Sequence, residues 1–371
     1  MIYKNLTINK KIWTMLNSMK KTSRIPNALL FHGNEGIGKE ACAIEFAALV
    51  TCSSQLDEFA CGKCKSCTKI LSNNHESIKY IFPLPRGKIT NKKDSILKSF
   101  NHKTIEQYNR ELNLKIMKPY HKIELDNANT ILINSIRDIK KEIYTTTTND
   151  SWRIIVIFES EKLCYPNQES ANSLLKILEE PPKKTLFILT TSKISLLLDT
   201  IKSRCIDLYF PRPSEEYFNS LSNNKTNINL YKLLDANIQN LTNIKDIEVN
   251  ALEIFVKNFN KLHRDKEIMS INLISEITKL NQSDKKLFLV YIESIKHYYK
   301  DLAIIKTDKN SDNLTFNFLK SDYLELNNSA TKKNWSYCVD TISNFQDNLQ
   351  KNLNLNLSMI NLLTTIKSFA L

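Results

Sequence analysis

Three of the chain's five glycines lie within one short stretch, at Gly33, Gly36 and Gly38. Lys39 follows them and completes the pattern G-x-x-x-x-G-K, in which backbone N–H groups cradle phosphate and the lysine reaches the terminal phosphate groups. The next residue in this pattern is normally Ser or Thr, whose hydroxyl binds Mg²⁺. Here it is Glu40. The stretch therefore predicts a phosphate loop whose metal end is altered.

Four of the chain's eight cysteines form a second cluster, with the spacing C-x8-C-x2-C-x2-C. Four thiolates in one compact segment suit a tetrahedral zinc ion, and four protein ligands leave no position open for catalysis. We therefore predict a structural zinc module over residues 52–67, with an iron–sulfur centre and a redox-active thiol pair as alternatives. The expected ligands are Cys52, Cys61, Cys64 and Cys67.

The elements that must position these residues can be inferred from the apolar patterns. An apolar run at 26–33 precedes the glycine loop and a helical pattern follows Lys39, which is the strand–loop–helix order that a phosphate loop requires. Further apolar, β-branched runs alternate with helical segments, and this alternation is typical of an α/β fold with a doubly wound parallel sheet. These strands are expected at 77–85, 152–159, 185–192 and 205–210, and the other helices at 8–21, 134–147 and 167–182.

The character of the chain changes after about residue 212, where strand-like runs end and only helical patterns continue. We therefore expect three domains. The first, at 1–212, holds the sheet, the second is a small helical domain at 213–253, and the third is a larger all-α domain at 254–371.

The expected strand at 152–159 bears on catalysis. Phosphate-loop ATPases place an Asp at the end of such a strand to hold Mg²⁺, often followed by a Glu that activates water. In this chain Phe158 occupies the Asp position and only Glu159 is kept. Together with Glu40, this second departure at the metal site argues against ATP hydrolysis by the chain alone.

The composition is that of a globular protein, with 42% hydrophobic and 25% charged residues. No apolar run reaches the length of about 18 residues that spans a membrane, and the N-terminal stretch lacks the apolar core of a signal peptide. We therefore expect a cytoplasmic protein with no membrane partner. A cytoplasmic location also argues against disulfides among the cysteines.

More than half of the formal net charge of +13 comes from residues 86–123, where ten basic residues stand against three acidic ones. Such a patch can face nucleic acid. The simpler interpretation is a solvated, Lys-rich insertion. We expect this segment to be irregular or loosely helical and assign no function to it.

A longer stretch carries a family resemblance. Residues 172–205, N-S-L-L-K-I-L-E-E-P-P-K-K-T-L-F-I-L-T-T-S-K-I-S-L-L-L-D-T-I-K-S-R-C, resemble the signature of bacterial clamp-loader subunits of the AAA+ class. In that family a helix ending in L-L-K-x-L-E-E-P-P leads to a sensor strand and then to an S-R-C motif. The glycine loop, the cysteine module and this signature occur in the family's order over about residues 10–212. The resemblance implies an AAA+ domain with an inserted zinc module, followed by a helical lid and an all-α collar.

The resemblance also implies a function. Hydrolysing tau/gamma subunits keep Thr or Ser after the loop lysine and Asp-Glu in the second strand, so Glu40 and Phe158 make this chain similar to the non-hydrolysing delta-prime type. Such a subunit is a stator in a five-subunit ring with tau/gamma and delta partners, which opens the sliding clamp and places it on primer-template DNA. Arg204 is then an arginine finger that reaches ATP in an adjacent tau/gamma subunit. Binding of ATP at this chain's own loop is left open.

Two other functions stay open on sequence alone. An ATP-hydrolysing tau/gamma-type motor would need Glu40 as an unusual Mg²⁺ ligand and would have to work without an Asp at Phe158. A zinc-containing phosphate-loop kinase for a small nucleotide would need a phosphoryl-acceptor site and an intact Mg²⁺ site, and the sequence shows neither.

Overall fold

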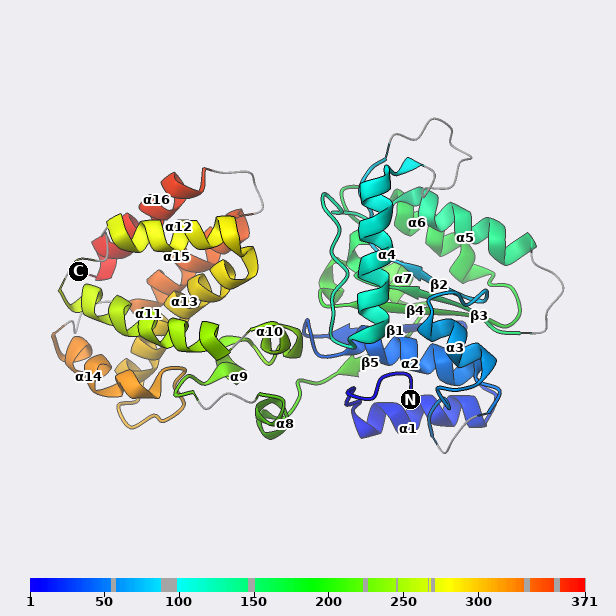
Figure 1. The fold of residues 1–371 in the computed structure, drawn as a ribbon, viewed down its shortest axis with the longest axis horizontal. Coiled ribbons are helices and arrows are strands. Elements are labelled where there is room, and N and C mark those ends of the chain that lie inside the picture. Colours follow the sequence, from blue (N-terminus) through cyan, green and yellow to red (C-terminus); the bar gives the residue numbers. More distant parts are fainter. Residues whose placement is uncertain are drawn as a thin grey trace. The chain divides into compact units, whose positions relative to one another are not determined.

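The protein forms two compact units, Met1–Pro213 and Ser214–Leu371, in a computed structural model (Figure 1). The first boundary lies next to the one expected at 212. The structure describes residues 1–54, 58–87, 99–145, 151–222, 226–244, 246–265, 267, 271–329, 334–349 and 354–370.

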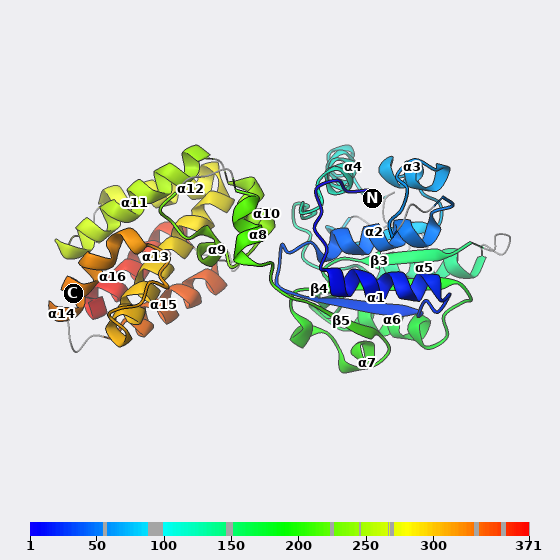
Figure 2. The same cartoon turned by 90° about the horizontal axis from the view of Figure 1, so that it is seen from below.

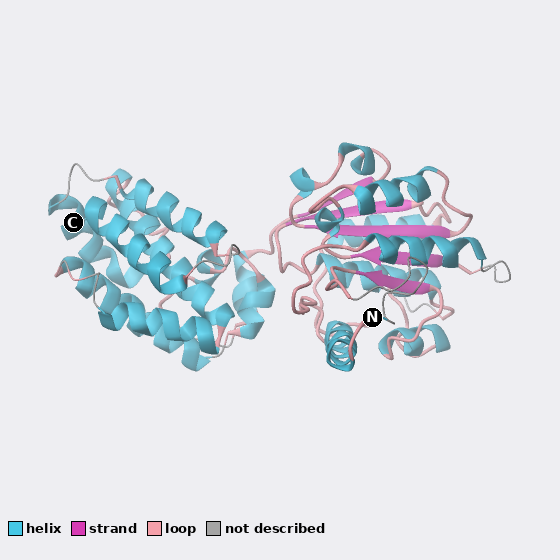
Figure 3. Ribbon diagram, turned by 90° about the horizontal axis from the view of Figure 1, so that it is seen from above, coloured by secondary structure: helices cyan, strands magenta, loops and turns pink. Residues whose placement is uncertain are grey.

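Unit 1 is built on a five-stranded sheet with the order β2-β3-β4-β1-β5. All four neighbouring pairs are parallel, so every connection must cross over the sheet. Figure 3 shows the strands side by side, with helices on both faces. The expected doubly wound α/β architecture is thus confirmed. The strands are β1 (Ala28–Gly33), β2 (Ile78–Ile81), β3 (Arg153–Ile157), β4 (Thr185–Thr191) and β5 (Ile206–Phe210).

Strand side chains alternate between two cores, as the period of a β-strand requires. Leu30, Ile155 and Phe187 belong to a buried cluster shared with α5 and α6. On the other face α2 packs against β1, β3 and β4 (Figure 2). The helices of unit 1 are α1 (Lys10–Lys21), α2 (Lys39–Thr51), α3 (Lys65–Leu71), α4 (His102–Met117), α5 (Ile133–Thr145), α6 (Glu169–Glu179) and α7 (Asp199–Lys202), with short 3₁₀ turns η2 (Ser160–Leu163) and η3 (Ile194–Leu196).

The basic segment at 86–123 differs from the expectation. Residues 88–98 lie outside the described part of the chain, but α4 is a regular helix of 16 residues, capped by the Asn101 side chain, which accepts the Thr104 N–H at 2.8 Å. One side of this helix is buried at Leu112 and Ile116, and Lys115 on the same helix is only 2% exposed. The segment is therefore not simply a solvated insertion, because part of it packs into the domain and buries one of its cations.

Among the described residues of unit 2 all regular elements are helices, as expected from residue 213 onward. The helix α13 contacts α9, α11, α12, α14 and α15 and forms the centre of this bundle. The predicted division at 253 falls within α11, and it stays a prediction. The helices are α8 (Glu215–Ser220), α9 (Leu230–Leu233), α10 (Ile238–Asn243), α11 (Asp246–Arg264), α12 (Ile271–Ser283), α13 (Lys285–Thr307), α14 (Lys320–Ser329), α15 (Trp335–Asn348) and α16 (Leu355–Ala370), with η4 (Asn317–Leu319) before α14.

Among the described helices of both units, none combines the length and the apolar character needed to cross a bilayer.

Candidate functional site

The glycine loop joins β1 to α2, as the sequence predicts. Gly36 and Gly38 have φ angles of 71° and 93°, in the left-handed region that glycine adopts without strain. Gly38 is the N-cap of α2, so the loop ends at a helix N-terminus, where N–H groups and the helix dipole favour an anion. A Cβ atom at Gly33 would lie 2.3 Å from the carbonyl oxygen of Phe210 on β5. Gly33 is therefore required by the sheet itself.

The loop lysine is turned onto its own loop. The Lys39 ammonium donates to the carbonyl oxygen of Gly33 at 2.9 Å and to that of Asn34. The residue is only 6% exposed. Burial lowers the pKa of Lys39 to about 8, although the carboxylates of Glu40 and Glu35 act in the opposite direction. This amine is therefore partly neutral in mildly alkaline solution.

The altered metal end of the loop contains an ion pair that the sequence analysis missed. Lys115 from α4 pairs with the Glu40 carboxylate. The same ammonium donates to the carbonyl oxygen of His121 at 2.6 Å and lies 5.6 Å from the centre of the Phe158 ring. Lys115 thus joins the two positions, Glu40 and Phe158, at which the sequence departs from a working phosphate loop.

Glu159, the acidic residue kept after β3, is also paired with lysines. Lys122 lies 3.3 Å and Lys162 3.0 Å from its carboxylate. Lys122 also pairs with Glu35 inside the glycine loop. Burial disfavours the charged form of Lys122, but Glu159 and Glu35 outweigh burial and raise its pKa. The segment after α4 is thereby tied to both sides of the candidate site.

The four predicted zinc ligands are brought together. The Sγ atoms of Cys52, Cys61, Cys64 and Cys67 all lie within 4.8 Å of one another. The Cys52–Cys64 and Cys61–Cys67 sulfur pairs are 3.8 and 3.9 Å apart. A tetrahedral zinc ion with bonds of about 2.3 Å needs sulfurs separated by roughly 3.8 Å, so the donor set fits zinc.

Backbone groups support the thiolate form that a metal requires. The N–H groups of Lys63 and Cys64 point at the Cys61 sulfur at 3.4 and 3.2 Å and lower the pKa of that thiol. His75 does not join the cluster, because its ring bonds the Ser66 hydroxyl and the Ser77 N–H at 3.0 and 3.2 Å. The ligand set is thus four cysteines, compatible with zinc.

A network of hydrogen bonds connects the cysteine module to α4. The Met1 amino group donates to the Ala60 carbonyl at 2.7 Å, within the module. The N–H groups of Ile2 and Tyr3 donate to the buried Glu45 carboxylate of α2 at 2.9–3.2 Å. The Tyr3 hydroxyl then donates to the Lys115 carbonyl at 2.9 Å. The N-terminal residues therefore link the module, α2 and α4 into one body.

The predicted finger residue, Arg204, lies just before β5. Its guanidinium donates to the Glu179 carboxylate and to the Thr200 carbonyl, each at 2.9 Å, and its side chain is 34% exposed. At the end of β4, Thr191 donates to the buried Glu161 carboxylate at 2.6 Å. Thr191 pairs in register with His32, one residue before the glycine loop, so the end of β4 and the loop meet at one edge of the sheet.

The sequence analysis missed Lys115 and Lys122 because it considers the net charge of residues 86–123 and not the individual side chains. One signal was present: Tyr108, Leu112 and Lys115 follow the spacing of a helix face, and that face is buried at Leu112. A lysine on an apolar stripe requires a partner, but the sequence does not indicate that this partner is Glu40. No sequence signal pointed to Lys122.

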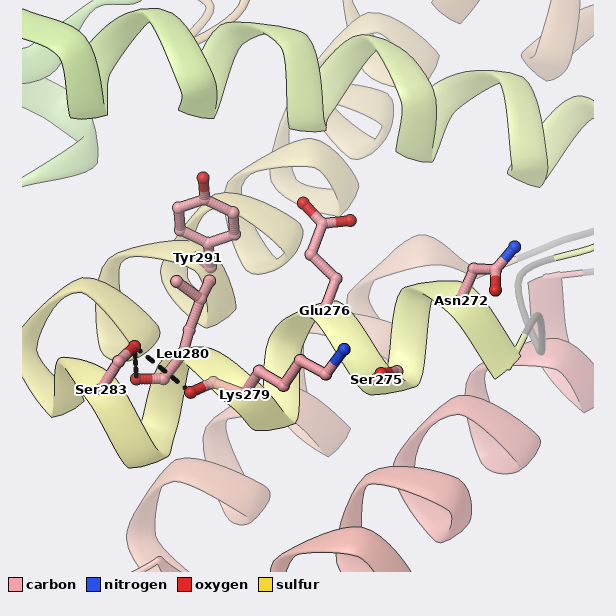
Figure 4. A pocket seen from close by; sticks show the side chains of 7 residues that line it. All are labelled: Asn272, Ser275, Glu276, Lys279, Leu280, Ser283 and Tyr291. Atoms are coloured by element: carbon pink, nitrogen blue, oxygen red, sulfur yellow. Dashed lines mark hydrogen bonds between the residues drawn. The ribbon is translucent and has the colours of Figure 1, made fainter.

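Unit 2 contains a separate open pocket of about 420 Å³ beside α12. Glu276 and Tyr291 point toward α11 there (Figure 4), and burial raises the pKa of Glu276. The pocket contains none of the sequence-predicted site residues.

Comparison with known proteins identifies a family model and several curated proteins that are similar to this chain. The family model described as "DNA polymerase III, delta subunit" matches residues 8–214. DNA polymerase III subunit delta' of Yersinia pestis is 25% identical over 201 residues, which cover 54% of this chain and 46% of that protein. DNA polymerase III subunit gamma of Buchnera aphidicola subsp. Schizaphis graminum is 26% identical over 214 residues, which cover 58% and 46%. The chain thus spans about half the length of the curated relatives it matches.

Among solved structures, a DNA polymerase III gamma subunit-related protein from Thermotoga maritima aligns over 97% of this chain and 99% of its own, with 15% identity and a TM-score of 0.41.

Replacing a cysteine of the cluster should destabilise unit 1 through loss of metal. Purified protein should contain about one zinc per chain, and Cys64→Ser should lower the melting temperature by on the order of 10 °C, because binding of a structural metal adds to the folding free energy. The matched control is Cys164→Ser, since Cys164 is a half-buried free thiol outside the cluster. Iron with visible absorbance, or equal melting temperatures for the two variants, would contradict the zinc assignment.

The buried amine of Lys39 should give unit 1 a pH-dependent stability. Its pKa falls from 10.5 to about 8 on folding, so the unfolded chain binds more protons between these values. The stabilising contribution is complete above pH 10.5 and is lost as the pH falls through about 8. We therefore compare the free energies of unfolding of wild type and Lys39→Met in urea. The value for wild type minus that for the variant should rise by on the order of 3 kcal/mol from neutral to alkaline pH. Substitution of the exposed Lys10 should produce no such rise.

Proposed function

Because the chain belongs to the DNA polymerase III delta-subunit family of clamp-loader proteins, we propose that it is a delta-prime-type subunit that does not hydrolyse ATP itself. In this role it assembles with tau/gamma and delta subunits in a five-membered ring in the cytoplasm. The assembly loads the sliding clamp on primer-template DNA during replication. Its own catalytic contribution is made to a neighbouring subunit.

The metal end of the glycine loop is the observation that carries this proposal. A phosphate-loop motor holds Mg²⁺ with a Ser or Thr hydroxyl after the loop lysine and with an Asp at the end of the neighbouring strand. Here the first position holds Glu40, paired with Lys115, and the second holds the buried ring of Phe158. Neither offers a free oxygen ligand for a metal ion, so we assign the glycines and Lys39 to a degenerate phosphate loop.

Arg204 has the chemistry of an arginine finger. A guanidinium fork binds phosphate oxygens in pairs and stabilises charge on a transferring phosphoryl group. In the free chain this fork rests on Glu179, whose side chain is 50% exposed. An exposed ion pair of this kind contributes at most about 1 kcal/mol, so Arg204 can leave it for a phosphate of a neighbouring subunit at small cost.

A tau/gamma-type motor is the second candidate, and two observations favour it. The chain keeps the three glycines, Lys39 and Glu159, and its similarity to a gamma subunit, 26% identity, equals its similarity to delta' subunits. In that case Glu40 would have to leave Lys115 and bind the metal ion.

The isolated chain should show no ATP turnover above background. The physical reason is the absence of an available oxygen ligand at Glu40 and Phe158, without which Mg²⁺ cannot bridge the phosphates. A phosphate-release assay of wild type and Lys39→Ala checks this expectation, and the two should be equal. Turnover that disappears in Lys39→Ala would instead identify a motor of the tau/gamma type.

Replacement of Arg204 should slow ATP turnover by the complex without preventing its assembly. Trans-acting arginines contribute about 10³–10⁵-fold at the site they serve, so Arg204→Ala should remove at least about half of the DNA-stimulated ATP turnover of the reconstituted complex. Arg204→Lys should be similarly impaired, because an ammonium lacks the fork. Lys202→Ala is the matched control, since Lys202 is a nearby cation paired with Asp199 at 2.6 Å. Unchanged turnover with intact assembly would disprove the finger role.

A further inference from the structure

We infer that Lys115 is a built-in counter-cation, whose ammonium occupies the place of a divalent metal ion and closes the glycine loop to metal-bound nucleotide. The inference rests on the proposal that this loop is a degenerate phosphate loop. It adds the residue that replaces the metal, and it gives a role to α4 and to the turn that follows it.

The position of the ammonium carries the argument. In a working loop the metal ion lies between the residue after the loop lysine and the end of the neighbouring strand. The Lys115 ammonium contacts those same two positions, as an ion pair with Glu40 and at 5.6 Å from the ring centre of Phe158. A single cation thus spans two positions that are 118 residues apart in the sequence, as a bound metal ion would.

The cation is part of a built site. The Lys115 side chain is 3% exposed, and its ammonium donates to Glu40 and to the carbonyl oxygens of His121 and Pro119, at 2.6 and 3.5 Å. These acceptors match the three protons of an ammonium group, so the charge is satisfied without water. A divalent ion brought next to it would meet a desolvated like charge, which is strongly unfavourable at low dielectric.

The segment after α4 holds this arrangement in place. Lys122 pairs with Glu35 within the loop and lies 3.3 Å from Glu159, the one acidic residue kept from the catalytic pattern. The Tyr120 ring covers the N-terminus of α2, because a Cβ at Gly38 would lie 3.0 Å from it. The loop's own lysine, Lys39, is bound to the carbonyls of Gly33 and Asn34. Every charged group of the loop is therefore partnered from within the chain.

The direct test is replacement of the ammonium by an added ion. Lys115→Met leaves the Glu40 carboxylate without its cation, and Mg²⁺ or Mn²⁺ should then bind there and restore stability. We expect ~5 mM MgCl₂ or MnCl₂ to raise the melting temperature of Lys115→Met by at least about 5 °C, and that of wild type by less than about 1 °C. KCl at the same ionic strength should not have this effect. If Lys115→Met does not fold, Lys115→Gln keeps donors for the carbonyls and takes its place.

Two further variants make the result specific. In Lys115→Met with Glu40→Gln both charges are gone, so rescue by divalent ions should disappear. Lys103→Met removes an exposed lysine of the same helix and should behave as wild type. Divalent rescue that is absent from both Lys115 variants, or that persists without the Glu40 carboxylate, would overturn the inference.

These outcomes are independent of the proposed function. ATP hydrolysis by the wild-type chain would remove the delta-prime assignment. An inactive chain whose Lys115 variants gain nothing from divalent ions would leave that assignment standing and remove only the counter-cation. Magnesium-dependent binding of a non-hydrolysable ATP analogue by wild type would also overturn the closed loop.

Discussion

The helix after the glycine loop, α2, must be covered on every side, because residues 41–50 are all buried. The sheet covers only one side of it. On the other sides lie the N-terminal residues held by Glu45, the cysteine module continuous with the end of α2, and α4 with the Lys115–Glu40 pair. The helix that begins at the glycine loop is thus surrounded by other segments of unit 1, and these segments also hold the partners of the loop's charged groups.

The need to cover α2 is consistent with the packing of a lysine-rich helix, α4, against it. Desolvating an ammonium is unfavourable unless a carboxylate and further acceptors compensate it, and among the described residues Lys115 has these partners on α2 and in the turn after α4. The Glu40 carboxylate, which replaces the hydroxyl of the phosphate-loop pattern, is the same group that makes burial of Lys115 possible. Glu40 in the loop and the buried Lys115 of α4 therefore depend on each other.

The sequence predicted many local features of the molecule, since the five strands, the helices α1, α2, α5 and α6, and the cysteine cluster all depend on patterns within a few residues. The short helices α3 and α7 were not predicted. Prediction from the sequence failed where a side chain depends on partners far along the chain. Lys115 pairs with a residue 75 positions away, and Arg204 with Glu179, 25 positions away, so neither pairing leaves a periodic trace. The basic composition of residues 86–123 suggested solvent-facing charge, whereas one side of α4 is apolar and is packed into the domain.

Gly33 is the first glycine of the phosphate-loop pattern, but the sheet requires it as well. Any side chain at this position would collide with the Phe210 carbonyl, 2.3 Å from a Cβ, so the neighbouring strand alone demands glycine there. The packing of the sheet is then enough to require the first glycine of the motif, whether or not a ligand binds. Gly33 by itself is therefore no evidence for a bound phosphate, and the residue after the lysine, Glu40, is the more informative position of the motif.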